Sequence, residues 1–83
     1  MNLTIKYFAS IREAIGTSSE AMQTSAQTLA ELRDALIARG GAHAESLARG
    51  RAVRMALNQV MSDETAHLSD GAEVAFFPPV TGG

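Results

Sequence analysis

The chain ends with Phe76-Phe77-Pro78-Pro79-Val80-Thr81-Gly82-Gly83, where an apolar strand gives way to a proline pair and then to two glycines. Proline fixes φ near −65° and lacks an N–H, so the pair ends strand pairing and favours an extended continuation. The final glycines have no Cβ and can enter a channel too narrow for other residues. The stretch therefore predicts a folded body over residues 1–78 and a projecting tail over residues 79–83.

The only distinctive functional group of this tail is the α-carboxylate of Gly83, which is ionised at neutral pH. A carboxylate is a poor electrophile, so an enzyme that uses it must first convert one oxygen into a leaving group, most simply by adenylylation with ATP. Gly83 is therefore the candidate reactive residue. The alternative is that Gly82 and Gly83 form a frayed end, because small residues accumulate at chain termini.

Composition limits the classes of function that the chain can have. Its 83 residues suffice for one small domain, and a formal charge of −2 leaves no basic face for nucleic acid. The absence of cysteine excludes disulfides and thiolate metal sites. No stretch resembles a signal peptide or a membrane span. We therefore expect a cytoplasmic protein with no metal site, no nucleic-acid partner and no membrane partner.

Alternating apolar residues predict the strands. Leu3, Ile5 and Tyr7 alternate with other residues in a first strand, and we expect a return strand within residues 17–24. Further strands are predicted at residues 52–58, 60–61 and 73–77, with turns at Asn58-Gln59 and Ser69-Asp70-Gly71.

The strongest helical signal begins at Thr28. Thr28 and Glu31 have the spacing of a capping box, Gly40-Gly41 ends the segment, and the apolar residues recur on one helix face: Leu29, Leu32, Leu36 and Ile37. A second capping box at Ser10–Glu13 predicts a short helix over residues 11–15. A further helical turn is expected around Leu47.

This order of elements predicts an α+β fold with a mixed four- to five-stranded sheet and one main helix packed on one face. A single helix covers only one face, so the other must meet water or a partner. If the first and last strands lie side by side at the centre, Phe8 and Phe77 point to the uncovered face, and Met61 joins them from the edge. Such a patch is typical of a protein interface. The alternative is that one phenylalanine is covered by a loop.

The remaining polar residues predict little chemistry. His43 and His67 are expected to be surface residues in loops, and four carboxylates are expected to be solvated: Asp63, Glu64, Asp70 and Glu73. Arg12 and Arg54 could pair with acidic groups of a partner, although an exposed arginine needs no such role. Lys6 is the only lysine, which weakly disfavours a modifier that builds chains on itself.

The C-terminal stretch resembles that of the small subunit of molybdopterin synthase, the MoaD-type sulfur carrier of the ubiquitin-like family. Phe8-Ala9-Ser10-Ile11-Arg12-Glu13, Gly16 and Leu57-Asn58-Gln59 support the resemblance, which covers nearly the whole chain. It implies a ubiquitin-like β-grasp fold. It also implies that an ATP-dependent, MoeB-like adenylyltransferase activates Gly83, and that a sulfurtransferase system then replaces AMP to leave a thiocarboxylate. This sulfur would be donated to cyclic pyranopterin monophosphate in molybdenum cofactor biosynthesis.

The resemblance also implies the partners and their contacts. The small subunit would join a MoaE-type large subunit in a heterotetramer of two large and two small subunits, with the catalytic side chains on the large one. The chain itself would bind no cofactor. The expected partner-binding residues are Phe8, Met61, Phe77, Pro78, Pro79, Val80, Thr81 and Gly82.

Three other interpretations stay open. The protein could be a modifier conjugated to target lysines through Gly83, which would leave adducts resistant to reducing agent. It could be a sulfur carrier for thiamine or cysteine synthesis, although the Phe-Phe-Pro-Pro-Val-Thr segment argues against this. It could also be an interaction module whose tail is incidental.

Overall fold

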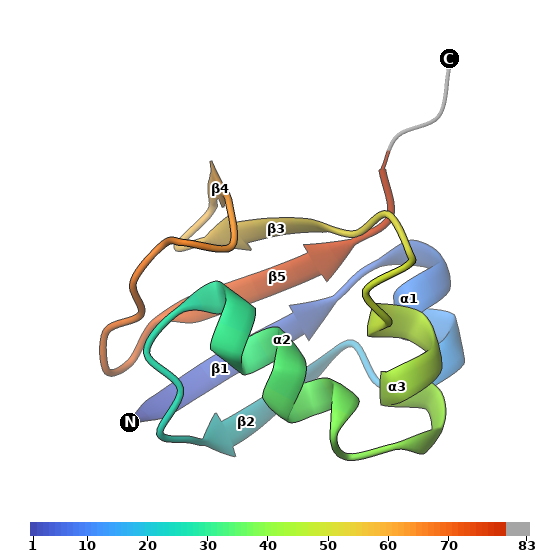
Figure 1. Cartoon of the computed structure of the whole chain (residues 1–83), viewed down its shortest axis with the longest axis horizontal. Coiled ribbons are helices and arrows are strands. Elements are labelled where there is room, and N and C mark those ends of the chain that lie inside the picture. The colour runs from blue at the N-terminus through green and yellow to red at the C-terminus, as the bar shows by residue number, and fades with distance from the viewer. Residues whose placement is uncertain (80–83) are drawn as a thin grey trace.

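The computed structural model describes residues 1–79, which form one mixed sheet and three helices. In chain order the elements are β1 (Asn2–Tyr7), α1 (Ala9–Ile15), β2 (Ser19–Gln23), α2 (Leu29–Ile37), α3 (Gly41–Leu47), β3 (Arg54–Leu57), β4 (Val60–Ser62) and β5 (Glu73–Phe77). The strand order is β2-β1-β5-β3-β4. Only β1 and β5 are parallel, and they lie at the centre (Figure 1). The predicted α+β fold is confirmed, with the β-grasp order of elements.

The two central strands, β1 and β5, supply buried side chains to the core. In β1 the alternation of Leu3, Ile5 and Tyr7 places all three side chains in the core, as predicted. In β5, Val74 and Phe76 are fully buried and lie opposite Ile5 and Tyr7 in the parallel register. Because alternate residues of a strand point to opposite faces, the intervening residues of both strands lie on the other side of the sheet.

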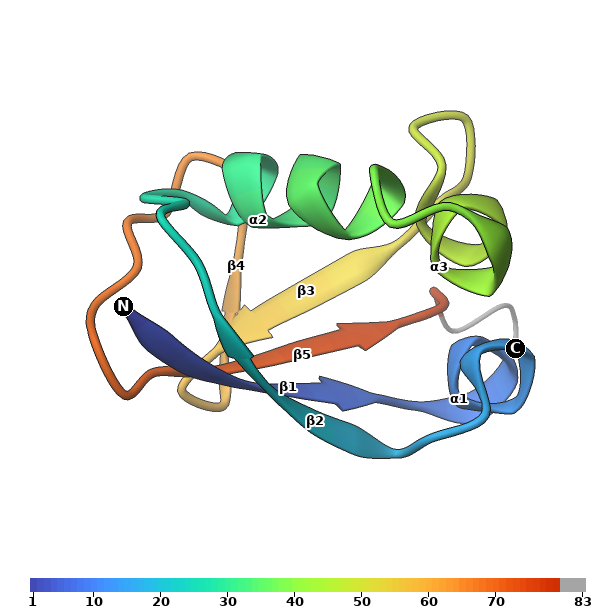
Figure 2. The same cartoon turned by 90° about the horizontal axis from the view of Figure 1, so that it is seen from below.

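Helix α2 covers the core side of the sheet, as its leucine spacing predicts (Figure 2). Leu29, Leu32 and Leu36 are fully buried. The Thr28 capping box is confirmed, because the Glu31 amide N–H donates to Thr28 Oγ1 at 3.2 Å. The Glu31 side chain accepts from the amide of Gln27, one residue before the cap, at 2.9 Å.

The capping box predicted at Ser10 is wrong. Helix α1 begins at Ala9, and the Phe8 carbonyl already accepts hydrogen bonds from the amides of Ile11 and Arg12. Ser10 therefore lies inside the first turn and cannot cap it. The predicted stop is confirmed, since Gly16 adopts the left-handed conformation at φ 90° and its amide donates to the Arg12 carbonyl.

Two segments differ in extent from the prediction. The helical turn expected around Leu47 is a separate helix, α3, which packs against both α1 and α2. Strand β3 is shorter than residues 52–58 because its ladder begins at Arg54. It turns into β4 through Asn58 and Gln59, with φ of 50° and 69°, as in the two-residue turns that match strand twist.

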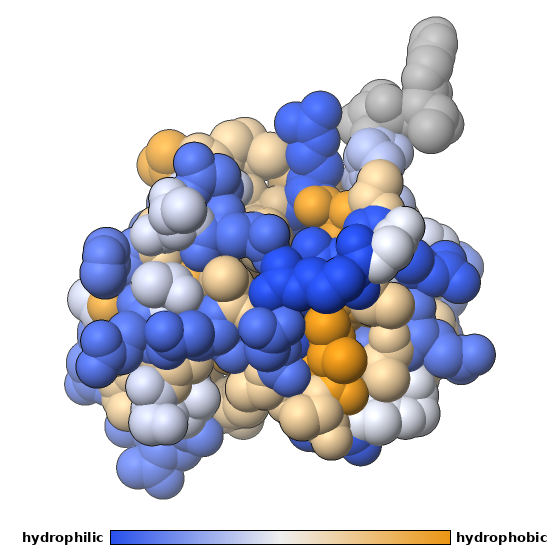
Figure 3. Space-filling model, in the orientation of Figure 1, coloured by the Kyte–Doolittle hydropathy of each residue, from blue (hydrophilic) through white to orange (hydrophobic). Residues whose placement is uncertain are grey.

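The helices leave one side of the sheet without a covering element (Figure 2). The helix-covered side is largely hydrophilic at its surface, with small apolar areas between the charged residues (Figure 3). Within residues 1–79, none of the helices has the length and apolar character needed to cross a membrane.

Candidate functional site

Strand β5 brings the chain to the point where the predicted tail starts. Phe77 is the last residue of the strand and the Cα partner of Arg54 in β3. Pro78 and Pro79 follow, and neither has an N–H with which to continue the ladder. Pro79 is the last described residue. The predicted binding residues Val80, Thr81 and Gly82 and the predicted reactive residue Gly83 lie outside the described residues, so their roles stay predictions.

Two aromatic side chains meet where β5 ends. The Phe8 amide N–H donates to the Phe76 carbonyl at 3.1 Å, which holds the residue after β1 beside β5. The rings of Phe8 and Phe77 contact each other edge to face, with centroids 6.3 Å apart and an interplanar angle of 86°. Phe8 is 44% exposed and Phe77 is partly exposed. The prediction that these aromatics come together is confirmed.

Met61 lies on the same side of the sheet. It is the Cα partner of Ala56, which in turn is the partner of Ala75 in β5. Directly paired residues point to one face, and Ala75 shares that face with Phe77 two residues later. Met61 is 52% exposed. We call this surface, formed by Phe8, Ala56, Met61, Ala75 and Phe77, the docking face.

A charged pair borders the docking face. Lys6 is the Cα partner of Ala75 in the parallel register. Its Nζ lies 3.7 Å from Oε1 of Glu73, two residues before Ala75. The docking face itself offers apolar contacts and no nucleophile or general base. It is therefore suited to binding.

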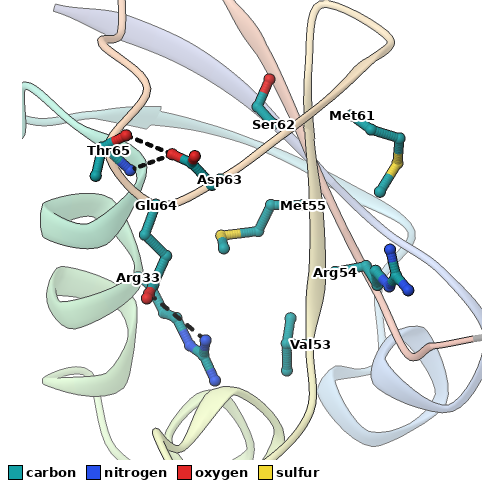
Figure 4. A pocket seen from close by; sticks show the side chains of 9 residues that line it. All are labelled: Arg33, Val53, Arg54, Met55, Met61, Ser62, Asp63, Glu64 and Thr65. Carbon is teal, nitrogen blue, oxygen red and sulfur yellow. Dashed lines mark hydrogen bonds and ion pairs between the residues drawn. The ribbon is translucent and has the colours of Figure 1, made fainter.

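A hollow of about 640 Å³ lies between α2, β3, β4 and the segment after β4, and Met61 of the docking face is one of its lining residues (Figure 4). Its polar floor is Arg33, which is only 5% exposed. Arg33 Nε donates to the Leu47 carbonyl at 2.7 Å, and Nη2 donates to the carbonyls of Ala48 and Arg51 at 2.8 and 3.1 Å. Burial lowers the pKa of Arg33 from its ordinary value. Arg33 therefore joins α2 to the chain that follows α3.

The carboxylates of this hollow also have partners. Glu64 Oε1 lies 3.6 Å from Arg33 Nη1 and also pairs with Arg49. Asp63 accepts hydrogen bonds from the hydroxyl and the amide of Thr65, and these bonds lower the pKa of Asp63 (Figure 4). Because its polar groups bind one another, we interpret the hollow as structural.

Of the four carboxylates expected to be solvated, Asp63 and Asp70 are exposed and Glu64 and Glu73 are partly exposed, and they also have partners in the fold. Glu64 pairs with two arginines, Asp70 Oδ1 accepts from the Asn2 amide at 2.6 Å, and Glu73 pairs with Lys6.

A second polar cluster is centred on Glu20 in β2. Tyr7 Oη donates to Glu20 Oε2 at 2.8 Å, Arg39 Nη1 lies 2.7 Å from Oε1, and His43 Nε2 lies 3.1 Å from Oε2. Burial raises the pKa of Tyr7 above its ordinary value, and the bond to Glu20 adds to this. For Glu20, burial opposes ionisation, but the hydrogen bonds from Arg39, Tyr7 and His43 outweigh it and lower the pKa to about 2.

This cluster corrects the prediction for His43. The residue lies in α3, not in a loop, and its ring meets that of Tyr7 edge to face at 5.9 Å. Sequence reasoning missed both clusters. Arg33 had a detectable signal, because it follows Leu29 by four residues and so falls on the buried face of α2. Among residues 1–79, no three histidine, aspartate or glutamate residues are grouped so that they could hold a metal ion.

The chain is similar to known proteins over nearly its whole length. It is 37% identical over 81 residues to the molybdopterin synthase sulfur carrier subunit of Escherichia coli, which covers 98% of this chain and 99% of the relative. Two solved structures share its fold over the full length of both chains. One is SAMP1, a small archaeal modifier protein from Haloferax volcanii, at 25% identity and a TM-score of 0.77. The other is a complex of subunits 1 and 2 of molybdopterin-converting factor from Helicobacter pylori, at 27% identity and a TM-score of 0.67.

A family model gives the same assignment. The ThiS family model matches residues 5–83, which include all three helices, the sheet apart from the first residues of β1, and the whole C-terminal stretch. The chain therefore belongs to the ThiS family of β-grasp proteins.

Proposed function

We propose that this protein is the sulfur carrier subunit of a molybdopterin synthase and that Gly83 carries the sulfur as a thiocarboxylate. The observation that carries the proposal is the exposed Phe8–Phe77 pair at the start of a tail that ends in Gly82-Gly83. The similarity to a molybdopterin synthase sulfur carrier subunit over 98% of the chain supports the choice of pathway.

The first chemical step is activation of the Gly83 carboxylate. In a MoeB-like adenylyltransferase, a carboxylate oxygen attacks the α-phosphorus of ATP, which releases pyrophosphate and leaves an acyl-adenylate. A sulfurtransferase system then supplies sulfur in place of AMP. The resulting thiocarboxylate is softer and more nucleophilic than a carboxylate, so the chain can carry sulfur although it has no cysteine.

The second step takes place on the large subunit. The docking face binds a MoaE-type subunit, and Pro78 and Pro79 direct the tail away from the sheet toward that subunit's active site. Five residues from Pro79 to Gly83 reach on the order of 15 Å when extended. The sulfur is then transferred to cyclic pyranopterin monophosphate. The complex between the two subunits of molybdopterin-converting factor from Helicobacter pylori supports such a partner.

The position of the terminal carbonyl provides the test. Deletion of Gly83, or addition of one glycine after it, moves the reacting carbonyl by about 3.5 Å. We expect either change to abolish sulfur loading by the activating enzyme while thermal unfolding of the body stays unchanged. A glycine added at the N-terminus is the matched control and should load normally. Normal loading of the shortened chain would contradict the proposal.

A second candidate function is protein modification through Gly83. The likeness to SAMP1 at 25% identity favours it. The two functions differ in their products, because a modifier forms isopeptide bonds that survive reducing agent, whereas a pure carrier leaves no such adducts. Mass spectrometry of lysine-linked peptides ending in the C-terminal residues of this chain would distinguish them.

A further inference from the structure

The seven cationic side chains fall into two groups according to their ion pairs. Four of them pair with a carboxylate: Lys6, Arg33, Arg39 and Arg49. The other three, Arg12, Arg51 and Arg54, are exposed and form no ion pair with another residue of the described chain. We call these three residues the arginine collar.

The collar lies at one end of the molecule. Arg54 is the first residue of β3 and pairs with Phe77, where β5 ends. Arg12 lies in α1, which follows β1 and therefore lies at the same end, because β1 and β5 are parallel. Arg51 lies three residues before Arg54 and lines a notch with Ser10 of α1. Figure 1 shows α1 and the start of β3 beside the end of β5, where the chain leaves the sheet.

Two exposed carboxylates that form no ion pair within residues 1–79 share this end: Glu13 in α1, and Glu45 in α3, which lines the same notch as Arg51. Three arginines less two glutamates leave a surplus of one positive side-chain charge at this end, although the side chains of the whole chain have a formal charge of −2. The rest of the body is therefore acidic. Such a separation of charge orients a protein as it approaches a partner. Apolar docking surfaces provide affinity but little orientation, so the collar supplies what the docking face lacks.

We propose that the arginine collar binds a ring of carboxylates at the entrance of the large-subunit channel that receives the tail. This inference rests on the proposed function. The end of the tail is an anion, so the bottom of that channel must favour negative charge. An acidic channel entrance would bind the arginine collar, and the basic groups at the bottom of the channel would then bind the terminal carboxylate. Charges at the rim of an interface act mainly on the association rate.

The test is the association rate of the full-length chain with its large subunit, measured by stopped flow over a range of ionic strengths. The variant is the triple substitution Arg12→Gln, Arg51→Gln and Arg54→Gln. We expect association about ten-fold slower at low salt, with a flatter salt dependence and nearly unchanged dissociation. Thermal unfolding should not change, because these side chains form no ion pair in the body. Should the triple variant fold poorly, Arg54→Gln alone should show a smaller effect of the same kind.

The matched control lowers the net charge by the same amount as the triple arginine variant, but at the opposite end of the molecule. Gln23, Ser25 and Ser69 are exposed. They belong to the opposite end, because Gln23 pairs with Asn2 at the start of β1 and the Gly71 amide donates to the Asn2 carbonyl. Changing all three to glutamate should slow association much less than loss of the collar. Equal slowing by both variants, or no slowing by the collar variant, would overturn the inference and leave the proposed function intact. A wild-type chain that does not bind the large subunit would overturn both.

Discussion

Phe76 and Phe77 are adjacent in sequence, but the pleat of β5 places them on opposite faces. Phe76 is fully buried against Tyr7, with ring centroids 6.3 Å apart, whereas Phe77 contacts the half-exposed Phe8. Substitutions of Phe76 and Phe77 therefore test folding and binding separately.

Phe77→Ala should weaken association with the large subunit by about 1–3 kcal/mol and change the free energy of unfolding little. The matched substitution Phe76→Ala removes a core ring and should lower the free energy of unfolding by about 3–5 kcal/mol. Calorimetric titration and urea unfolding of both variants measure the two effects. Severe unfolding of the Phe77 variant would show that its ring belongs to the core.

Glu20 makes stability depend on pH at the acid end. Its pKa in the folded protein, about 2, lies below the ordinary value of 4.5, so ionised Glu20 stabilises the fold. This contribution is complete above about pH 4.5 and is lost as the pH falls toward 2. Glu20→Gln should therefore flatten the decline in urea stability between these values. Glu13→Gln, which changes an exposed carboxylate without an ion pair, should retain the wild-type decline. If stability declined at acid pH in the Glu20→Gln variant as it does in the wild type, this would contradict the stabilising role of ionised Glu20.

At the scale of elements, Arg33 connects α2 to the segment after α3. Arg33→Ala removes the side-chain donor from the carbonyls of Leu47, Ala48 and Arg51, of which Ala48 still accepts from the Arg51 amide, so we expect a loss of about 2–4 kcal/mol in the free energy of unfolding. Arg12→Ala, at an exposed arginine of α1, should change it by less than about 0.5 kcal/mol. Urea denaturation measures the free energy of unfolding of both variants. Similar values for the two would contradict the role of Arg33 in joining α2 to the segment after α3.

Most helices and strands could be predicted from the sequence because the signals that mark them depend on residues close together in the chain. The leucines of α2 and the alternation in β1 lie at the spacings that bury one face, and both predictions are confirmed. The capping boxes show the limit of such signals. Thr28 caps α2 because the chain arrives extended, but the Ser10 motif fails because pairing of Phe8 with β5 starts α1 earlier. Capping depends on where the preceding strand ends, which the motif does not encode.

The polar clusters could not be predicted in the same way. Glu20, Tyr7 and His43 come from three elements, and their contact depends on how α3 packs beside the sheet. The docking face was predictable because it needs only strand parity and the central position of β1 and β5. Its binding role and the role of Gly83 come from the chemistry of the residues and from the resemblance.

At the scale of the whole molecule, β5 ends at one end of the sheet, where Pro78 and Pro79 follow it, and an apolar face lies beside this point. The buried side chains of Arg33 and Tyr7 have hydrogen-bond partners within the body. The proposed function therefore places the reactive atom at the terminal carbonyl of Gly83, for use in the active sites of other proteins.

The most direct test of this assignment is a single-turnover reaction with Gly83 loaded as a thiocarboxylate that carries an isotope of sulfur. The loaded chain is mixed with its large subunit and cyclic pyranopterin monophosphate, and protein and product are analysed by mass spectrometry. The account predicts that the label leaves Gly83 and appears in the dithiolene of molybdopterin, and that the chain returns to a carboxylate. Label that stays on the chain, or product whose sulfur is unlabelled, would contradict it.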